Sequence, residues 1–594
     1  MAINPYVGIE GYYFGKYVYS DGNLKFEPLG NALDLVKIQQ YEEEECYELV
    51  FEYDYNGNLH KQSIPRTALS KKGLLEYSGK GIDAFEHTVG TLIKVIQQQE
   101  ENYFAKGGTI EFLHKKLGWD KVSVDGVETD VFKHYYVDDI YHSTYIGNYD
   151  IKPKGSLKGW IKDIKNEVIG YTPCEFILAC ALSSVVLGYI GVEANCENIF
   201  HHLVGDSGSG KTTMGYLATA TAGNPNISAN SLYRTWASTS NALISSKMGN
   251  YGLVTVLDEI SMFTGRDMTD LIYKISAGID KGRLSKDCEL RETKSFLTVH
   301  LSTGEASALA KCRNNTGIKI RLNEVKAPWT MSAEHSERIK QNSLNNYGFA
   351  APKLAKLVKE KGREQLLVRL EFWKNRYKQE TKVLEFADRM SIRHGIIMLA
   401  GELANEVFGF GLNLDNILNF IINNEYENSD NRDVGIEAYH KLVSYIHMNQ
   451  HHFAKSVDAP LKKVTEEYST YQPLWGKIDR MDKNMKVNNK PIVEEISIFR
   501  DKFTEIIHEL GFEDEKIVLE KMKAKGLLNC ESGRYYRKRK IIEGGQVERV
   551  YVINVIGEDE DIEEASNIIN NNQAKRSGSQ GIKKHNLRRK QDEE

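Results

Sequence analysis

The stretch that most constrains this chain is residues 205–212, whose sequence GDSGSGKT has the G-x-x-x-x-G-K-[ST] form of a phosphate-binding loop. The apolar run at 199–204 before it predicts a buried strand, and residues 213–221 after it predict a helix. Backbone N–H groups of such a loop close around phosphate oxygens, while Lys211 reaches the β- and γ-phosphates and the Thr212 hydroxyl holds Mg²⁺. The cofactors predicted from this loop are therefore ATP and Mg²⁺. The predicted binding residues are Gly205, Asp206, Ser207, Gly208, Ser209, Gly210, Lys211, Thr212 and Thr213.

A second motif follows further along the chain, where the apolar run at 253–257 ends in the carboxylates Asp258 and Glu259. Such a run is typical of a buried parallel strand that brings acidic residues to its C-terminal edge. In this Walker B pattern Asp258 holds Mg²⁺ together with Thr212, and Glu259 polarises the attacking water. We therefore predict an ATPase with Lys211, Asp258 and Glu259 as catalytic residues. The alternative is an ordinary strand followed by an acidic helix cap.

Length and composition set the broad class of protein. At 594 residues the chain is too long for one core, so several domains are expected. The net charge of -5 means that any contact with nucleic acid comes from local basic patches. The seven cysteines are scattered without a C-x-x-C pair, so neither a zinc site nor a disulfide framework is expected.

Two further segments bear on where the protein works. The sequence begins without the basic and apolar pattern of a secretory signal, which favours a cytoplasmic location. Residues 176–192 are almost wholly apolar, but serines and glycines interrupt them and they are short for a bilayer core of about 30 Å. This segment predicts a buried helix, and no membrane partner is expected.

Residues 1–150 predict a β-rich N-terminal domain. Alternating runs rich in aromatic residues at 12–19 and 47–53 predict strands, and Asp21-Gly22-Asn23 and Asn56-Gly57-Asn58 predict hairpin turns. Aromatic residues interleaved with lysines can stack on single-stranded bases. A half-buried sheet face is the simpler interpretation.

Residues 151–330 predict an α/β core of alternating strands and helices. After a helix at 268–277, residues 280–291 have the pattern of a β-hairpin that carries cations. In ring ATPases that move DNA a hairpin at this position projects towards the pore, so its cations are candidate phosphate contacts. The predicted DNA contacts here are Lys281, Arg283 and, at the tip, Lys286. A solvated surface hairpin is the alternative.

The end of the core offers further candidates. Residues 295–304 predict another core strand whose polar end can sense the γ-phosphate, and residues 317–322 predict one more strand. Arg321 can reach a neighbouring subunit's nucleotide and stabilise charge in the transition state, with Arg313 as the competing residue. A surface salt bridge is the alternative for either arginine.

Residues 331–430 predict a helical lid, in which an amphipathic helix presents Arg389 and Arg393 as possible nucleotide sensors. Residues 431–490 predict a polar helical linker, in which adjacent histidines at 451 and 452 point to different sides and make metal binding unexpected.

Residues 491–556 predict a winged helix, with helices at 496–510 and 513–525 and two strands around Glu543-Gly544-Gly545. The first of these strands is rich in cations and predicts contact with duplex DNA, whereas a protein-interaction wing is the alternative. The predicted contacts are Arg534, Arg537, Lys538, Arg539 and Lys540. Residues 557–594 predict a disordered charged tail.

The order of these motifs resembles a domain-of-unknown-function family of ATPases carried by mobile elements, and within it the Cch helicases of staphylococcal cassette chromosomes. The segments that carry the resemblance are Leu117-Gly118-Trp119, the loop at 205–212, Leu257-Asp258-Glu259, Lys281-Gly282-Arg283, Ser302-Thr303-Gly304-Glu305 and Asn346-Tyr347-Gly348. That family is similar to MCM helicases. The resemblance therefore implies a multidomain α/β protein whose P-loop core is of the AAA+ class, with a helical lid, a C-terminal winged helix and assembly into a hexameric ring.

The resemblance also implies roles for single residues. Arg321 matches the MCM arginine finger, and Arg389 falls at the position of the MCM lid arginine. MCM rings carry an asparagine as first sensor, whereas Ser302-Thr303 occupies that place here, with Thr303 as the candidate. The zinc site of many MCM N-terminal domains has no counterpart in the cysteine spacing of this chain.

These observations and the resemblance predict an ATP-dependent, ring-forming, MCM-like DNA helicase that unwinds DNA for replication of a mobile genetic element. The resemblance to MCM helicases implies 3′–5′ polarity. The expected partners are single- and double-stranded DNA, further copies of the chain and an element-encoded primase or polymerase. The alternative is an origin-binding initiator that ATP switches between assembly states, without processive unwinding. A protein-remodelling ATPase would be expected to carry a pore aromatic in place of Lys286.

Overall fold

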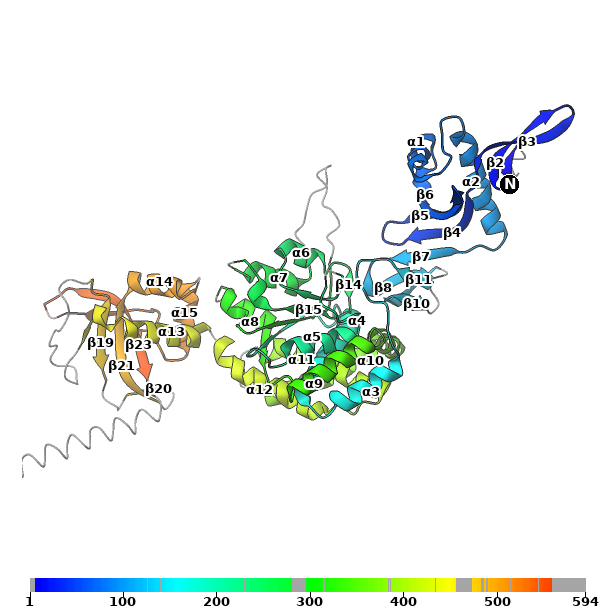
Figure 1. The fold of residues 1–594 in the computed structure, drawn as a ribbon. Coiled ribbons are helices and arrows are strands. Elements are labelled where there is room, and N and C mark those ends of the chain that lie inside the picture. The colour runs from blue at the N-terminus through cyan, green and yellow to red at the C-terminus, as the bar shows by residue number, and fades with distance from the viewer. Residues whose placement is uncertain are drawn as a thin grey trace, which may run out of the picture. The chain divides into compact units, whose positions relative to one another are not determined.

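The computed structural model describes residues 6–557, apart from 125, 139–141, 229, 266, 280–294, 314–315, 383, 385, 433, 456–472, 482–484, 488–489, 513 and 543. The chain forms two compact units, residues 1–308 with 321–424 and residues 309–320 with 425–594 (Figure 1). The cationic hairpin expected at 280–291 and the tail expected from 557 onwards, apart from residue 557 itself, lie outside the described residues.

The N-terminal part of the first unit is rich in β-strands, as the alternating runs predict. Its antiparallel three-stranded sheet has the order β1 (Val7–Glu10), β2 (Tyr13–Ser20), β3 (Asn23–Asn31). A six-stranded sheet has the order β10 (Tyr136–Asp138), β11 (His142–Tyr145), β7 (Ile110–His114), β4 (Asp34–Tyr41), β5 (Cys46–Tyr55), β6 (Asn58–Pro65). Both predicted hairpins are confirmed. Their turns, Asp21-Gly22 and Asn56-Gly57, have positive φ at both residues, as tight hairpin turns require.

Helical segments complete this part: α1 (Lys71–Leu75), α2 (Val89–Ala105) and short 3₁₀ turns at Arg66–Ala68 and Ser78–Lys80. Helix α2 buries Leu92 and Ile96 against the apolar side chains of the strands. The helix was not foreseen in a region whose pattern is dominated by strands. Its apolar spacing is nevertheless helical, because Leu92, Val95 and Ile96 lie three and four residues apart.

A small sheet ties the N-terminal part to the core. It has the order β14 (Asn250–Tyr251), β8 (Leu117–Val124), β9 (Val127–Lys133). Gly118 has φ +80, and a Cβ there would lie 2.0 Å from the carbonyl oxygen of Tyr251, so only glycine fits. The indole of Trp119 donates to the carbonyl oxygen of Val185, 2.8 Å away in helix α4. This sheet is therefore anchored to the core by backbone pairing and by a buried side chain.

The core of the first unit is a five-stranded parallel sheet. Its order is β13 (Tyr233–Thr235), β15 (Thr255–Asp258), β16 (Val299–Gly304), β12 (Ile199–Val204), β17 (Leu322–Lys326). Strands β12, β15 and β16 thus fall where the apolar runs predict them. Because the strands are parallel, Val204, Asp258 and Gly304 end at the same edge of the sheet.

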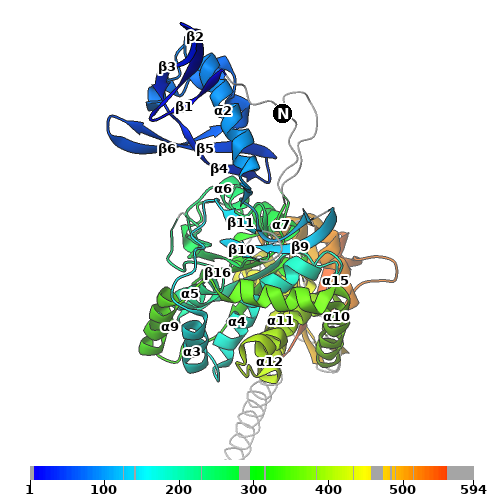
Figure 2. The same cartoon turned by 90° about the vertical axis from the view of Figure 1, so that its right-hand side faces the viewer.

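Helices surround this sheet: α3 (Leu157–Glu167), α4 (Thr172–Ile190), α5 (Lys211–Ala220), α6 (Ser240–Ser245), α7 (Thr269–Ala277), α9 (Ala333–Asn345), α10 (Ala350–Glu380), α11 (Ala387–Phe408) and α12 (Leu414–Arg432). Helix α4 is the apolar segment predicted to be a buried helix. Length and composition alone would let it span a membrane, yet 89% of its most apolar window is buried inside the protein. Helices α10 and α11 pack on each other and on α4, which makes α4 a core helix (Figure 2).

One predicted strand has a different structure. Residues 317–321 lie in helix α8 (Thr316–Arg321), and the strand β17 begins only at Leu322. Ile318 and Ile320 alternate with charged residues, which is the pattern of a strand. A run of six residues is too short, however, for periodicity to distinguish a strand from a short helix.

The second unit combines helices with a mostly antiparallel sheet, and most of its buried apolar side chains lie in one cluster. It contains α13 (Val434–Met448), α14 (Arg500–Glu509) and α15 (Glu515–Ala524). Its sheet has the order β18 (Phe453–Lys455), β19 (Gly476–Arg480), β21 (Lys490–Phe499), β23 (Val547–Ile556), β22 (Arg537–Lys540), with β20 (Lys486–Val487) paired to β21.

In the described residues of the helical linker expected at 431–490, the α-helix ends at Met448, and β18, β19 and β20 then join the sheet. The helix expected from Ile496 also begins later, at Arg500, because Ile496 and Ile498 lie on β21 and are buried in its pairing with β23. Spacing of apolar residues by three and four across this junction imitates one continuous helix.

Candidate nucleotide site and basic surfaces

The predicted phosphate-binding loop connects β12 to α5, as its motif requires. Gly208 and Gly210 have φ of +78 and +92, conformations that favour glycine. The side chain of Lys211 is buried, and its ammonium group donates to the carbonyl oxygens of Gly205 at 2.6 Å and Asp206 at 2.7 Å. The predicted loop residues therefore lie together, with the lysine held across the loop.

Residues without any sequence motif support the loop from outside. The N–H group of Trp329 donates to the carbonyl oxygen of Ser209 at 3.1 Å. The hydroxyl groups of Thr213 and Ser336 lie 2.5 Å apart, so the Thr213 side chain bonds to α9. The Tyr233 hydroxyl donates to the carbonyl oxygen of Thr212 at 2.9 Å. No spacing rule could have found these supports, because they depend on how distant segments pack.

The predicted Walker B carboxylates, Asp258 and Glu259, lie next to the loop at the edge of the sheet. The Thr212 hydroxyl lies 3.5 Å from both carboxylate oxygens of Asp258. Thr303, at the end of β16, donates its hydroxyl to Asp258 and accepts the N–H of Glu259 at 3.0 Å. Burial raises the pKa of Asp258, and the hydrogen bond from Thr303 opposes that rise. Of the pair Ser302-Thr303, it is therefore Thr303 that touches the acidic residues.

Glu259 is held in a strained backbone conformation. Its φ is +59, in the left-handed region, which costs a residue with a Cβ about 1–3 kcal/mol. Its carboxylate caps the next turn by accepting the N–H of Ser261 at 3.2 Å. Strain of this kind concentrates at functional sites, where the surrounding structure maintains it.

A buried polar network lies beneath these residues. Ser302 points away from Thr303, and its hydroxyl contacts His202 Nδ1 at 2.9 Å and accepts the indole N–H of Trp236 at 2.9 Å. His202 Nε2 donates to the carbonyl oxygen of Ala306 at 3.0 Å. Burial lowers the pKa of His202, which keeps the ring neutral. His202 thus joins the strand that enters the loop to the segment that follows β16.

The donor set fits Mg²⁺ bound together with a phosphate ligand. Mg²⁺ is usually held by one or two protein oxygens, with phosphate and water completing its coordination. Thr212 and Asp258 offer one hydroxyl and one carboxylate within 3.5 Å of each other. Among the described residues no cluster of three or more His, Cys, Asp or Glu side chains could hold a metal by itself.

The predicted Arg321 does not lie at this edge of the sheet. Strand pairing places Leu322 beside Phe200, so Arg321 lies at the end of β12 opposite the phosphate-binding loop. Its guanidinium pairs with Glu197 at 3.5 Å and lies 4.9 Å from the ring centroid of Tyr273. Arg389 is exposed in the first turn of α11, and within the described chain no recorded contact joins it to the loop.

The predicted cations of the second unit divide into two groups. Lys538 and Lys540 are exposed on β22, and Arg534 is exposed just before it, whereas Arg537 is half-buried. Arg539 turns under the sheet, where its guanidinium donates to Glu495 at 2.7 Å. The Glu495 side chain is only 5% exposed, so Arg539 has a structural contact. Lys281, Arg283 and Lys286 lie outside the described residues.

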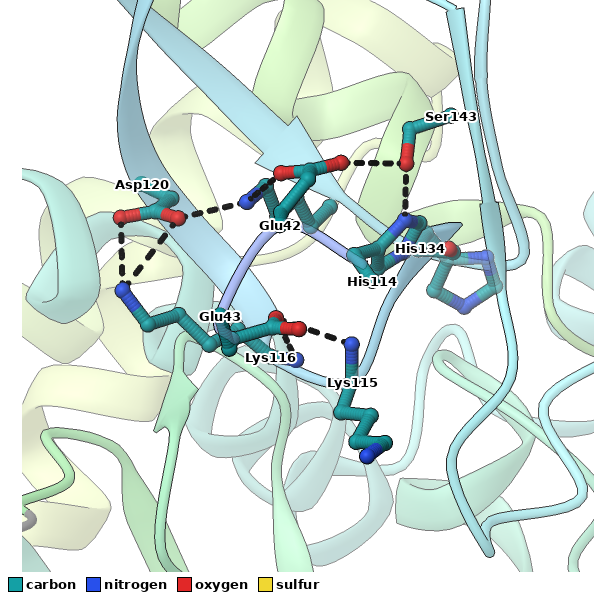
Figure 3. A network of polar contacts seen from close by, with 9 residues as sticks. Glu42, Glu43, His114, Lys115, Lys116, Asp120, His134 and Ser143 are labelled. Atoms are coloured by element: carbon teal, nitrogen blue, oxygen red, sulfur yellow. Dashed lines mark hydrogen bonds and ion pairs between the residues drawn. The ribbon is translucent and has the colours of Figure 1, made fainter. Parts of the chain in front are cut away.

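A second polar network joins the six-stranded N-terminal sheet to the small sheet of β8 and β9, and His134 extends it to the core (Figure 3). The buried ammonium of Lys133 contacts Glu42 and, at 2.6 Å, Asp120. The Ser143 hydroxyl donates to Glu42 at 2.6 Å and lies 2.7 Å from His114 Nδ1. Nearby, burial lowers the pKa of His134 to about 4, and the neutral ring donates from Nε2 to the carbonyl oxygen of Ala222, 2.6 Å away and just beyond α5. We refer to this network as the polar joint.

Two family matches and one structural match agree with this architecture. Residues 31–295 match the family "Domain of unknown function (DUF927)", and residues 433–558 match "Cch helix turn helix domain". No curated protein matches the chain. A solved structure described as "SCCmec type IV Cch - active helicase" has a TM-score of 0.71 and 20% sequence identity, and the match covers 93% of this chain and 98% of that chain.

The fold and the two domain matches define the class first: a multidomain α/β protein with a Cch-like fold and a C-terminal helix–turn–helix domain. Within that class, the chain is similar to Cch-type proteins in its fold and in its helix–turn–helix domain. The resemblance that the motif order indicated is therefore confirmed.

Proposed function

We propose that this protein is an ATP-dependent DNA helicase with a P-loop core of the AAA+ class. The observation that carries the proposal is the meeting of Lys211, Thr212, Asp258, Glu259 and Thr303 at one edge of the parallel sheet. The strand β16 lies between the loop strand β12 and the acidic strand β15. This order places a polar residue, Thr303, between the phosphate-binding loop and the acidic pair.

Each residue then has a chemical role. The loop N–H groups and Lys211 bind the phosphates, and Thr212 with Asp258 would hold Mg²⁺, whose charge stabilises the transferring phosphoryl group. Glu259 polarises the attacking water. Thr303 holds Asp258 and Glu259 in one orientation through its two hydrogen bonds. The strained backbone of Glu259 supports a functional rather than a structural role.

We also propose that the active form is a homo-hexameric ring. Arg321 lies at the edge of the sheet opposite its own phosphate-binding loop, so it suits a nucleotide held by the next subunit. Its contacts with Glu197 and Tyr273 would be exchanged for that nucleotide on assembly. Arg389 on α11 is the proposed lid sensor and would act in the same way, on nucleotide brought to it by closure or assembly.

DNA is the proposed partner. The family matches include a helix–turn–helix domain, and the matched structure is described as an active helicase. On the translocated strand, the proposed contacts are Lys281, Arg283 and Lys286. On the C-terminal wing, they are Arg534, Arg537, Lys538 and Lys540. Arg539 was also predicted to contact DNA, but its buried pair with Glu495 favours a structural role.

We further propose 3′–5′ polarity, a role in mobile-element replication beside an element-encoded primase or polymerase, and a cytoplasmic location. The cysteines of the described chain are all free thiols, which fits that location.

The proposal is tested by measuring ATP hydrolysis with and without DNA for the intact chain and for Glu259→Gln. Removing a residue that polarises water costs about 10²–10⁴-fold in rate, so kcat should fall by about that factor while nucleotide still binds. Glu360→Gln is the matched control, because Glu360 is an exposed carboxylate on α10. Undiminished hydrolysis by the Glu259 variant would contradict the assignment.

Measuring strand displacement beside ATP hydrolysis distinguishes a helicase from an ATP-switched initiator. A helicase hydrolyses faster on DNA and separates the strands of a forked duplex. An initiator binds ATP and DNA but shows no strand displacement. Comparing a 3′ tail with a 5′ tail then tests the proposed polarity.

A further inference from the structure

The second unit carries a cluster of cations that the sequence pattern did not bring together. The guanidinium carbons of Arg500, Arg534 and Arg549 lie 5.6, 5.7 and 5.4 Å from the ring centroid of Tyr536. They come from three elements: the first residue of α14, the turn before β22, and β23. Lys538 on β22 stands directly opposite Arg549 on β23. We call these five residues the Tyr536 surface.

The charge of this surface is poorly compensated. Like charges directly opposite each other in antiparallel strands are destabilising, and Lys538 faces Arg549 in this way. Arg500, Arg534, Lys538 and Arg549 are all exposed. In the described part of the chain the one ion pair recorded for these four cations joins Arg534 to Glu531 at 3.5 Å. Both side chains of that pair are about half exposed, so it contributes little.

Two carboxylates near the Tyr536 surface have other contacts. Glu515 accepts hydrogen bonds from Thr504 and, at 2.9 Å, from the Tyr551 hydroxyl. Arg500 reaches that same hydroxyl only at 3.4 Å. Glu548 stands opposite Arg539 rather than beside the cluster. The fold therefore maintains four exposed cations around one tyrosine, an arrangement that an anionic partner would stabilise.

The arrangement indicates phosphates rather than bases as the ligand. A base-stacking platform needs an open aromatic face, whereas the Tyr536 ring is partly buried and ringed by three guanidinium groups. Guanidinium groups bind phosphate oxygens in two-pronged hydrogen bonds. Duplex DNA offers one negative charge per ~1.7 Å of axis, a density that suits clustered cations better than one extended strand does.

We propose that the Tyr536 surface binds the phosphodiester backbone of duplex DNA without reading its sequence. The inference deepens the proposed function, since it names the residues with which the helix–turn–helix unit holds DNA. The inference also changes the DNA contacts that the sequence predicted. It adds Arg500 and Arg549, and it removes Arg539, which forms a buried pair with Glu495. Tyr536 acts by holding the guanidinium groups apart and in place.

The test is the salt dependence of binding, measured by fluorescence anisotropy on the full chain without ATP. Each phosphate contact adds about 0.9 to the slope of log affinity against log salt. The double variant Arg500→Gln/Arg549→Gln should therefore reduce the magnitude of that slope by about 2, equally on duplexes of unrelated sequence. Because no nucleotide is present, the result is independent of whether the protein is an ATPase.

Matched variants keep the test specific. Arg480→Gln/Lys490→Gln removes two exposed cations of the same unit that lie outside the Tyr536 surface, and should leave the slope unchanged. Arg500→Lys/Arg549→Lys keeps the charge and should retain most of the slope. A slope unchanged by Arg500→Gln/Arg549→Gln overturns the proposal. An equal loss on a single strand, with duplex binding intact, assigns the surface to single-stranded DNA and overturns the duplex assignment.

Discussion

Replacing Lys133 should weaken the polar joint between the six-stranded N-terminal sheet and the small sheet that contains β8 and β9. The Lys133 side chain is 2% exposed, and it pairs with Glu42 and Asp120, whose side chains are 12% and 20% exposed. In Lys133→Met the two carboxylates remain in place without their cation. Removing one partner of a buried pair costs about 3–5 kcal/mol, because the other charge stays buried.

Hydrogen exchange measures this change locally. Since about 1.4 kcal/mol is a factor of ten, exchange of amides in β7, β8 and β9 should be at least about 100-fold faster in the variant. Lys121→Met is the control, because the Lys121–Glu128 pair lies nearby on β8 and β9 with side chains 61% and 75% exposed. That pair should contribute at most about 1 kcal/mol. Equal protection in Lys133→Met and Lys121→Met would refute the reasoning.

The pH dependence of the defect gives a second check. Burial raises the pKa of Asp120, but the charges and hydrogen bonds of Lys133 and Lys116 together outweigh this effect, and the pKa is lowered. A lowered carboxyl pKa contributes stability above its unfolded value of about 3.9, so the intact joint should hold at both pH 7 and pH 5. In Lys133→Met, burial and the facing Glu42 raise that pKa, and protonation stabilises the fold as pH falls. The loss of stability caused by Lys133→Met should therefore be smaller at pH 5 than at pH 7.

Three further predictions concern the core. Thr303→Val removes two hydrogen bonds of about 1 kcal/mol each, so kcat for ATP should fall roughly 10–100-fold with little change in the Kd for ATP; an unchanged kcat would exclude Thr303 from the site. The Arg321→Ala variant should lose ATP hydrolysis when it is assayed by itself. It should regain part of that activity when mixed with Lys211→Ala, because the proposed arginine finger acts on the nucleotide of a neighbouring subunit. Burial lowers the pKa of Lys247 to about 7, so this lysine costs stability as pH falls from about 10.4 towards 7, with a slope of up to about 1.4 kcal/mol per pH unit. Lys247→Met should therefore raise the melting temperature at pH 7 and have less effect at pH 9, and a pH-independent effect would contradict this.

The site was predictable from sequence as far as its residues are contiguous. The loop at 205–212 and the pair Asp258-Glu259 follow from spacing alone, because their geometry is local. His202, Tyr233 and Trp329 were missed, since they reach the site through strand register and through the packing of distant segments. Thr303 was already the candidate from the sequence, and its hydrogen bonds to Asp258 and Glu259 support that choice over Ser302.

The C-terminal wing shows a second limit of prediction from sequence. In β22 successive side chains alternate between the two faces of the sheet, so Arg539 turns in towards Glu495 while Lys538 and Lys540 remain exposed. A strand of four consecutive cations carries no contrast between polar and apolar residues, and sequence alone therefore cannot indicate which of them face solvent. The same holds for Arg500 and Arg549, which come together only through the tertiary fold.

The most direct test of the central claim is strand displacement on a forked DNA duplex with ATP and Mg²⁺, comparing the intact chain with Lys211→Ala. The account predicts that the intact chain separates the strands and that the variant does not, because Lys211 is the loop residue proposed to bind the phosphates. Displacement by the Lys211 variant at the intact rate, or hydrolysis stimulated by DNA without any displacement by the intact chain, would contradict the account.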